Sequence, residues 1–367
     1  MLLRRKVRLW LAAALIGACA DEPDVFAWLR AGGGFVDPRQ HFAVGENGVR
    51  GLFARAPIAR GEVLLRVPWS MLIEGDAPGD ACSTIHATLA ALRRGGGGGA
   101  AGAAPGFEPY LDVLDGYALT VPGAWAPRER RVLLQGLPGA RDARRHHAWG
   151  AAACGLREGE PLGERALLLY VARSVGWTTA DQQFHSGMVP VYDSYNHRNG
   201  RWLNVVYDPR MEGAFHMVAR RDVAAGEQLY NSYGDGAPDI FRDYGFVEQT
   251  PARWWLDEGA PDGEGGGERD FTFVVDDGGA GAGRFARLDR PRAARAFAEA
   301  ARRKQRELRE HRERVRSELG VVDRVMGEHA WPHAELAFEF RAAYEEAVDL
   351  ALAEAERLVA AERPEEL

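Results

Sequence analysis

Two short polar clusters between residues 187 and 248 constrain this chain more than any other feature. The first, residues 193–197 (DSYNH), directly follows the apolar run at residues 188–191. The second, residues 231–234 (NSYG), follows another apolar pair. Between them the pattern predicts a strand over residues 214–219 and a turn over residues 222–228 that leads into the next strand. Polar groups at the ends of buried apolar runs line binding clefts, so we expect a site here.

The order and spacing of short motifs in this stretch resemble a SET domain, the knotted β fold of protein methyltransferases that use S-adenosylmethionine. The subgroup it resembles most contains the Rubisco large-subunit lysine methyltransferase and the actin-histidine methyltransferase. Each motif alone is a weak signal, and their combination carries the resemblance. The matching residues are Val189-Pro190, Asp193, Asn196-His197, Gly226-Glu227-Gln228, Ser232-Tyr233-Gly234 and Tyr244-Gly245-Phe246.

A second group of matches lies near the start of the chain. Strands are predicted over residues 51–54 and 63–68, with a turn at residues 59–62. Read without the later motifs, this pattern is an ordinary β meander. The stretch GVRGLFARAPIARGEVLLRVP resembles the opening of SET domains. In the family the backbone here forms one wall of the cofactor site, and the resemblance places Phe53 in that wall.

The resemblance implies an α+β fold: a SET β domain of short strands, an inserted α-helical lobe and a C-terminal α-helical domain. Helices are predicted at residues 25–29, 82–94 and 167–175, and apolar spacings of three and four predict a long helix over residues 336–358. The Arg-rich stretch 284–316 is predicted to be helical, and residues 270–275 a strand. The expected segments are a signal peptide (1–20), the first SET part (21–82), the helical lobe (83–185), the second SET part (186–250), a Gly-rich linker with a strand (251–283) and a helical substrate-binding-like domain (284–367).

The resemblance also implies roles for individual residues. Tyr233 matches the catalytic tyrosine, which orients the acceptor amine and stabilises the transition state. Asn196 and His197 match the pair that holds the cofactor near its amino-acid and adenine ends. Arg173 matches an arginine that reaches the cofactor carboxylate, which a planar guanidinium can bind with two hydrogen bonds. The residues assigned to the cofactor are Phe53, Arg173, Asp193, Tyr195, Asn196, His197, Tyr244 and Phe246.

Structural roles stay open for several of these residues. Arg173 could equally be a surface arginine without a ligand. Asp193 could serve to stabilise the local turn. Tyr244 and Phe246 wall either the adenine pocket or the lysine channel, or simply pack in the core. Tyr233 could be a structural tyrosine at a sheet edge.

Methyl transfer to an amine requires a neutral acceptor at about 3–3.5 Å from the methyl group. A free lysine has a pKa of about 10.4, and a partly desolvated channel disfavours its charged form. The resemblance therefore implies an S-adenosylmethionine-dependent protein-lysine N-methyltransferase acting on a non-histone protein.

Two departures from the subgroup matter. Residues 235–241 replace its SNAELL segment, and Val175 stands where the histidine-modifying relative carries an amide, which favours lysine because an apolar side chain cannot hydrogen-bond an imidazole.

Three other functions are considered. The chain could be a catalytically inactive SET-fold protein-binding module, against which the intact Asn196-His197 pair and Tyr233 argue, or a protein-histidine methyltransferase. A metal-dependent oxygenase would use His185, His197, His216 and Asp193. The spacing of these residues matches no HxD or HExxH pattern, so no metal is expected.

The first twenty residues have the features of a cleaved secretory signal: a basic start, an apolar stretch and the small residues Ala18 and Ala20 before an acidic pair. The alternatives are an uncleaved anchor and an organelle presequence. We expect the secretory pathway, or a plastid reached through it, and no membrane span after cleavage. Cys82 and Cys154 would then remain, either as a disulfide or as two buried thiols. The net charge of -7 gives no general argument for nucleic-acid binding. The expected partner is the protein substrate that the resemblance implies.

Overall fold

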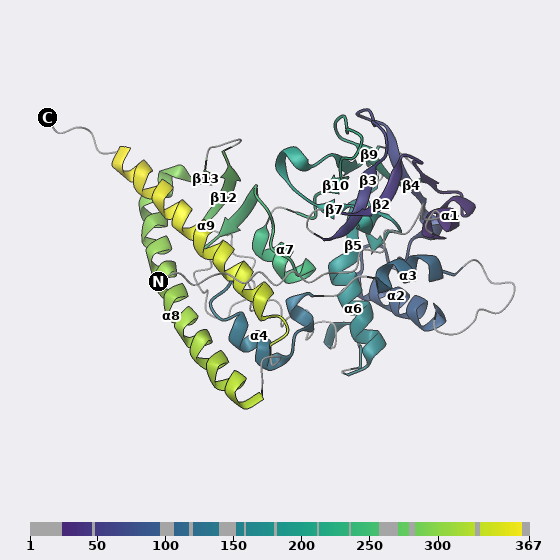
Figure 1. Cartoon of the computed structure of the whole chain (residues 1–367). Coiled ribbons are helices and arrows are strands. Elements are labelled where there is room, and N and C mark those ends of the chain that lie inside the picture. Colours follow the sequence, from purple (N-terminus) through teal and green to yellow (C-terminus); the bar gives the residue numbers. More distant parts are fainter. Residues whose placement is uncertain are drawn as a thin grey trace.

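A computed structural model describes residues 24–45, 48–95, 106–116, 120–138, 152–157, 159–179, 182–210, 213–234, 236–256, 271–278, 283–326 and 331–361. Figure 1 shows a strand-rich part with packed helices at one end of the molecule and two long C-terminal helices at the other. Each end has its own large apolar core. The predicted signal peptide, the glycine tract at residues 96–105 and most of the predicted linker lie outside the described residues.

The strand-rich part is built from an antiparallel sheet and a separate hairpin. The sheet has the order β1-β4-β9-β8, and β2 pairs with β3. The strands predicted at residues 51–54, 63–68 and 214–219 are confirmed as β3, β4 and β9. The bounds are α1 (Asp24–Ala31), β1 (Phe35–Val36), β2 (Gln40–Val44), β3 (Arg50–Ala54), β4 (Val63–Pro68), β8 (Val205–Tyr207) and β9 (Ala214–Ala219).

A short parallel pair joins the two polar clusters. Strand β7 (Asn196–His197) lies beside β10 (Tyr230–Asn231), with Asn196 opposite Tyr230 and His197 opposite Asn231. Parallel neighbours require a long connection, which here is the stretch that contains β8 and β9. The chain segments that follow β7 and β10 therefore leave the pair in the same direction and meet.

The helix predicted over residues 167–175 ends earlier than expected. It stops at Arg173, and Ser174–Thr178 forms strand β5, which pairs with β6 (Phe184–Met188). Val175, Gly176 and Trp177 explain the change, because branched, aromatic and glycine residues are poor helix formers and the first two kinds favour strands. The lobe's helices are α2 (Ala81–Gly95), α3 (Glu108–Asp115), α4 (Pro127–Leu133) and α6 (Pro161–Arg173).

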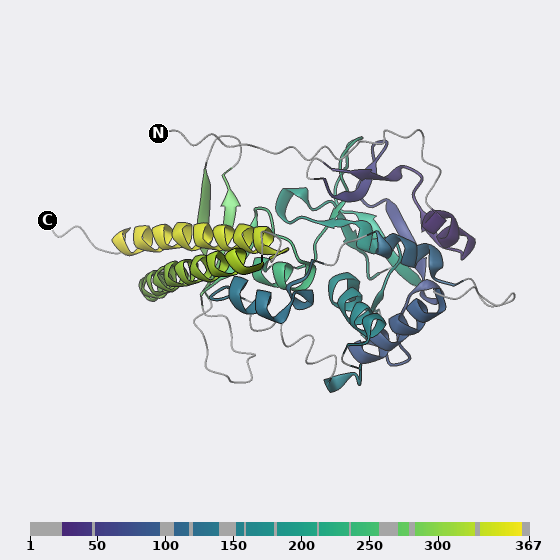
Figure 2. The same ribbon diagram turned by 60° about the horizontal axis from the view of Figure 1, so that its bottom comes forward.

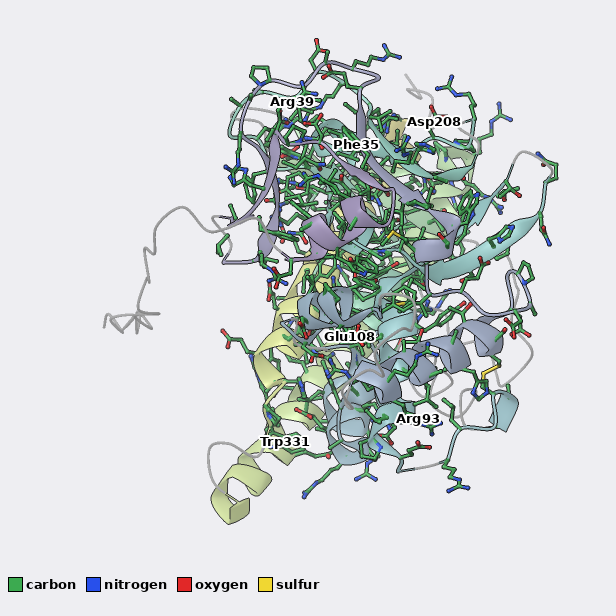
Figure 3. All side chains as sticks on the ribbon, turned by 90° about the vertical axis from the view of Figure 1, so that its right-hand side faces the viewer. Phe35, Arg39, Arg93, Glu108, Asp208 and Trp331 are labelled. Carbon is green, nitrogen blue, oxygen red and sulfur yellow. A yellow bond between two sulfur atoms is a disulfide. The ribbon has the colours of Figure 1, made fainter. Side chains whose placement is uncertain are left out.

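A disulfide answers the question that the sequence left open for the two cysteines. Cys82 at the start of α2 is bonded to Cys154, which precedes α6. The yellow bond in Figure 3 marks it, near the labelled Arg93, whose guanidinium pairs with Glu160 at 2.6 Å. The bridge closes a loop of 72 residues and sits over a small apolar core between α2 and α6. It therefore fixes the helix that ends at Arg173.

The C-terminal part differs from its prediction in one respect. The Arg-rich stretch expected to be helical from residue 284 begins with strand β13 (Arg284–Leu288), in which Ala286 and Leu288 are buried and their neighbours exposed. The helix predicted over residues 336–358 is confirmed within α9. The elements are β11 (Ala252–Trp255), β12 (Thr272–Asp277), β13, α8 (Ala294–Met326) and α9 (Ala334–Ala361).

Helices α8 and α9 lie side by side (Figure 2), and charged pairs join them. Arg302 of α8 binds Glu356 at 2.6 Å, and Arg312 of α8 pairs with Glu345. Arg284 of β13 also binds α9, through Glu346 at 2.8 Å. Arginines that give the stretch its basic character are thus matched by glutamates of α9. Among the described residues, no helix has the length and apolar character needed to cross a membrane.

Helix α7 (Ala237–Tyr244) links the two ends of the molecule (Figure 1). Its Phe241 ring stacks on Phe340 of α9 with 3.9 Å between ring centroids. Its last residue, Tyr244, points instead to the segments that leave β7 and β10. Gly245 ends the helix in the left-handed conformation at φ 72°, which glycine adopts without a steric penalty. The C-terminal core therefore holds α7 at the position where polar residues gather.

Candidate active site

An aromatic cluster forms where the segments after β7 and β10 meet. The ring of Tyr233 lies 4.6 Å from that of Tyr244 and 5.3 Å from that of His197, measured between centroids. Phe246 lies 6.0 Å from His197. Four predicted site residues are thus brought together from three segments of the chain. Their ring faces are electron-rich and suit a cationic ligand.

Tyr233 is held at both ends by hydrogen bonds. Its hydroxyl donates to the backbone carbonyl of Tyr195 at 2.8 Å, and its backbone N–H donates to Nδ1 of His197 at 2.9 Å. Burial raises the pKa of the Tyr233 hydroxyl, so this group stays protonated at neutral pH. Because its proton is engaged by a carbonyl, its oxygen can accept a hydrogen bond from a ligand.

Asp193 and Arg173 form the charged side of the site. Arg173 donates to the backbone carbonyl of Asp193 at 3.0 Å. The Asp193 carboxyl is buried and accepts a hydrogen bond from the Tyr110 hydroxyl at 3.1 Å through Oδ2, while Oδ1 has no hydrogen-bond partner in the described part of the chain. Burial raises the pKa of Asp193 to about 6, and the charge of Arg173 opposes this shift.

Backbone strain sets the direction of Asp193. Val191 has a φ of 69°, a region that a β-branched residue rarely adopts, and it is directly followed by the short helix η3 (Tyr192–Ser194). Such a conformation costs on the order of 1–3 kcal/mol and persists only where the surroundings enforce it. Both Val191 and Tyr192 are buried in the apolar core. The core thus enforces the turn that presents Asp193.

The raised pKa of Asp193 predicts a pH-dependent stability. Between about pH 4 and 6 the folded state keeps this proton while the unfolded state, with a pKa near 3.8, has lost it. The free energy of unfolding should therefore fall by up to about 3 kcal/mol as pH rises through this window, and it should stay level above the window. An Asp193→Asn variant should lack this slope and be more stable than wild type at pH 7.5.

Chemical denaturation at pH values from 4 to 8 measures this difference. Asp208 supplies the control, because Arg210 lowers the pKa of its carboxyl to about 2. Asp208→Asn should lose stability at pH 7.5 instead of gaining it. If Asp193→Asn and wild type have parallel profiles, Asp193 does not titrate in this window.

Asn196 is held against β3 at a position where only glycine fits. Its Nδ2 donates to the carbonyl of Arg50 at 3.1 Å. A Cβ at Gly51 would lie 2.6 Å from this Nδ2 and 2.4 Å from Nε2 of Gln228, closer than real contacts allow. Gly51 is therefore required for the observed position of Asn196.

We expect a Gly51→Ala variant to displace the Asn196 amide. Because both crowded atoms are side-chain ends, the stability cost should stay near about 1 kcal/mol, while affinity for a ligand that contacts Asn196 should fall at least about tenfold. Gly163→Ala in α6 is the control, since its Cβ would have 3.7 Å to the nearest atom. That change should slightly stabilise the helix. Thermal unfolding and ligand titration of both variants test this, and equal behaviour would contradict it.

The side chains of two predicted residues lie outside the aromatic cluster. The Tyr195 side chain is fully buried and its hydroxyl donates to Oε1 of Gln40 at 2.6 Å, so the residue offers the site its backbone carbonyl rather than its ring. The Phe53 ring lies 6.2 Å from that of His41, on the β2–β3 hairpin. The structure records no ring contact of Phe53 with the aromatic cluster among the described residues. Its assigned contact stays a prediction.

The structure adds residues that the sequence reading did not single out. Glu248 is buried and binds Nε2 of His197 at 2.8 Å. Asn199 contacts both Glu248 and the segment around Tyr233. Asn231 donates to the hydroxyl of Tyr192 at 2.8 Å. The sequence offered one signal for Glu248: it lies two residues after the Tyr244-Gly245-Phe246 motif.

The histidines weighed for a metal site are separated. His185 binds Glu74 at 2.8 Å and stacks on Trp177, while His216 contacts the carbonyl of Ala214. His197 binds Glu248. Within the described ranges, no group of three histidine, cysteine, aspartate or glutamate residues is arranged to hold a metal.

Comparisons with known proteins agree with this geometry. The family model of the SET domain matches residues 49–234. A curated relative, Ribosomal lysine N-methyltransferase 4 of Schizosaccharomyces pombe, is 34% identical over 68 residues, which are 18% of this chain and 14% of that protein. The chain thus matches only a small part of that relative's length.

Solved structures give a likeness over most of the chain. The structure of Rubisco LSMT bound to AdoMet has a TM-score of 0.54 and 15% identity, covering 91% of both chains. The SET domain of LSMT bound to MeLysine and AdoHcy has a TM-score of 0.54 and 16% identity, again covering 91% of both chains. At these identities the likeness shows the fold.

Proposed function

This chain belongs to the SET domain family, and on that premise we propose that it is an S-adenosylmethionine-dependent protein-lysine N-methyltransferase. The observation that carries the proposal is the position of the Tyr233 hydroxyl. It donates to the Tyr195 carbonyl and lies in an aromatic cluster beside a buried carboxylate and Arg173. Of the functions considered, amine methylation uses this arrangement best.

The residues of the site fit S-adenosylmethionine. Arg173 would supply a guanidinium for the cofactor carboxylate, and the Asn196 amide and the backbone of His197 would supply polar groups on the adjoining strand. Asp193 Oδ1 is a buried oxygen that lacks a hydrogen-bond partner within the described residues, so the site has an acceptor to offer to a ligand. When bound, the cofactor would supply a methyl group on a sulfonium. The amine nitrogen would bond to the methyl carbon in line with the carbon–sulfur bond, and the sulfur would leave as a neutral thioether.

Tyr233 would orient the acceptor amine. Because the Tyr233 hydroxyl donates its hydrogen bond to the Tyr195 carbonyl, its oxygen can accept a hydrogen bond from an N–H of the amine and so direct the nitrogen lone pair. The rings of Tyr233 and Tyr244 exclude water, and this loss of hydration lowers the pKa of the amine and favours its neutral form. Burial raises the pKa of the Tyr244 hydroxyl to about 12, so both tyrosines remain neutral partners. The chain's contribution is thus positioning and desolvation.

Lysine is the proposed acceptor in preference to histidine. Val175, at the position where an amide would serve an imidazole acceptor, packs against the apolar core. It offers no hydrogen bond. The named relatives also support this choice, since one is a ribosomal lysine methyltransferase and the Rubisco LSMT structure holds MeLysine. One of these relatives is named for the ribosome and the other for Rubisco, and we propose a non-histone protein as substrate.

The experiment is methylation of a cell extract with isotope-labelled S-adenosylmethionine and the purified chain. Mass spectrometry of labelled peptides distinguishes lysine from histidine as the modified residue. We expect label on lysine. Label on histidine would replace the proposed acceptor, and no label with wild-type protein that binds the cofactor would favour the inactive binding module.

We further propose entry into the secretory pathway, either as the destination or as the route to a plastid. The disulfide between Cys82 and Cys154 supports this proposal, because such bonds persist in oxidising compartments. The predicted cleavage site lies outside the described residues. Sequencing the N-terminus of the protein from its native cells should give a start at Asp21, and an intact Met1 would contradict cleavage.

A further inference from the structure

We propose that Glu248 is a positioning residue for Tyr233: it fixes the ring of His197 and, with Asn199, the backbone of residues 232–234. The proposal rests on the proposed function of the site and adds to it a residue that touches neither reactant. Glu248 lies on the segment that leaves α7, 51 positions along the chain from His197. The fold, rather than a local motif, brings the two together.

The first arm of the contact runs through His197. Oε1 of Glu248 lies 2.8 Å from Nε2 of His197, and both side chains are only 1% exposed. On the other side of the ring, Nδ1 accepts the backbone N–H of Tyr233 at 2.9 Å. A backbone N–H can only donate, so Nδ1 carries no proton and Nε2 donates to the carboxylate. Glu248 and Tyr233 thus hold one imidazole in a single tautomer.

The second arm runs through Asn199. Its Nδ2 donates to the same Oε1 of Glu248 at 2.8 Å and to the carbonyl of Gly234 at 2.9 Å. Its Oδ1 accepts the hydroxyl of Ser232 at 2.8 Å. The residues on both sides of Tyr233 are therefore tied to Glu248 through one amide. Together the arms secure three consecutive residues of the segment that carries the catalytic tyrosine.

The energetics point to a role beyond stability. A buried carboxylate is costly unless several donors satisfy it. Here two donors share Oε1, while Oε2 has no hydrogen-bond partner within the part of the chain that the structure describes. An apolar residue of similar size would avoid this cost, yet it would release His197 and Asn199. What the side chain supplies is one acceptor oxygen that both arms share.

The test compares Glu248→Met, which keeps the volume and removes the acceptor, with Glu248→Gln, which keeps an acceptor oxygen. Amide hydrogen exchange by mass spectrometry reports on residues 231–236, and histidine ¹⁵N NMR reports the tautomer of His197. We expect Glu248→Met to speed exchange of the segment at least about tenfold and to lower kcat about 10- to 100-fold, with KM changed less than about threefold. Glu248→Gln should retain most of both properties.

The chain offers a control in a second Glu–His pair, in which the glutamate is buried and the histidine is 27% exposed. Glu129 of α4 binds Nδ1 of His333 at 2.9 Å and is 3% exposed, in the contact with the C-terminal helices. Glu129→Met removes the same kind of acceptor there. It should lower stability without changing exchange at residues 231–236 or the rate of methyl transfer.

Several outcomes would overturn the proposal. One is the finding, by NMR of the wild-type protein, that His197 carries its proton on Nδ1. This measurement needs no variant. Another is a Glu248→Met protein whose exchange at residues 231–236 matches that of Glu129→Met. Both readouts are independent of activity. If the wild-type protein transfers no methyl group, the proposed function fails, while exchange and NMR still decide whether Glu248 positions Tyr233.

Discussion

A Tyr233→Phe variant should bind S-adenosylmethionine with an affinity within about threefold of wild type and transfer methyl groups about 10²- to 10³-fold more slowly. The change removes only the hydroxyl, which donates to the Tyr195 carbonyl at 2.8 Å and is proposed to accept the amine N–H. Losing one preorganised hydrogen-bonding group that acts in the transition state has an effect of this size. Single-turnover kinetics with a saturating lysine substrate measure it separately from product release.

The control for this variant removes an equivalent hydroxyl elsewhere. Tyr344 of α9 is fully buried and donates to the carbonyl of Trp255 at 3.1 Å. Tyr344→Phe should cost about 1 kcal/mol of stability and leave the rate unchanged. A Tyr233→Phe enzyme as fast as wild type would show that the amine is oriented by another group.

Replacing Arg173 should strongly weaken cofactor binding. Arg173 contacts the Asp193 backbone, and its charge acts on Asp193, Tyr233 and Tyr244. In Arg173→Met the cofactor carboxylate would lose its partner, and the buried Asp193 would lose its nearby cation. Removing one partner from such a charged contact costs about 2–5 kcal/mol, so we expect the Kd to rise about 30-fold or more. Isothermal titration calorimetry measures the change.

Arg165 lies on the same helix and serves as the matched control. It pairs with Asp115 at the surface, where a salt bridge contributes at most about 1 kcal/mol. Arg165→Met should therefore bind the cofactor as wild type does. If Arg173→Met also retains wild-type affinity while remaining folded, Arg173 has a structural role, which was the alternative considered from the sequence.

Where the sequence predicted structure correctly, a local pattern was sufficient. Strand β4 is an apolar run between turn residues, and α9 shows regular apolar spacing over its whole length. The two polar clusters were recognised because each directly follows a buried run. The parallel β7–β10 pair, which was not predicted, brings the two clusters together.

The differences arise where long-range packing decides the outcome. The apolar pattern of α6 continues past its end into Val175, so periodicity alone does not mark the end at Arg173. Strand β13 lies within an Arg-rich run, and only its pairing with β12 makes it a strand. The orientation of Tyr195 toward Gln40 depends on the strained turn at Val191, which sequence patterns do not reveal.

Glu248 illustrates the same limit within the site. Its partners, His197 and Asn199, lie about fifty positions earlier in the chain, and no local spacing connects them. Motif matching finds residues that belong to short sequence motifs of the family, such as Ser232-Tyr233-Gly234. It does not find a carboxylate whose role depends on the path of the chain after α7.

The central claim is that the residues gathered around Tyr233 form a binding site for S-adenosylmethionine. Isothermal titration calorimetry with the purified wild-type chain, beside the Asn196→Ala/His197→Ala double variant, tests it most directly. We predict binding by the wild type and none by the folded double variant. A wild-type protein that is folded by circular dichroism and shows no heat of binding would contradict the claim and favour a SET-fold module that binds protein without catalysis.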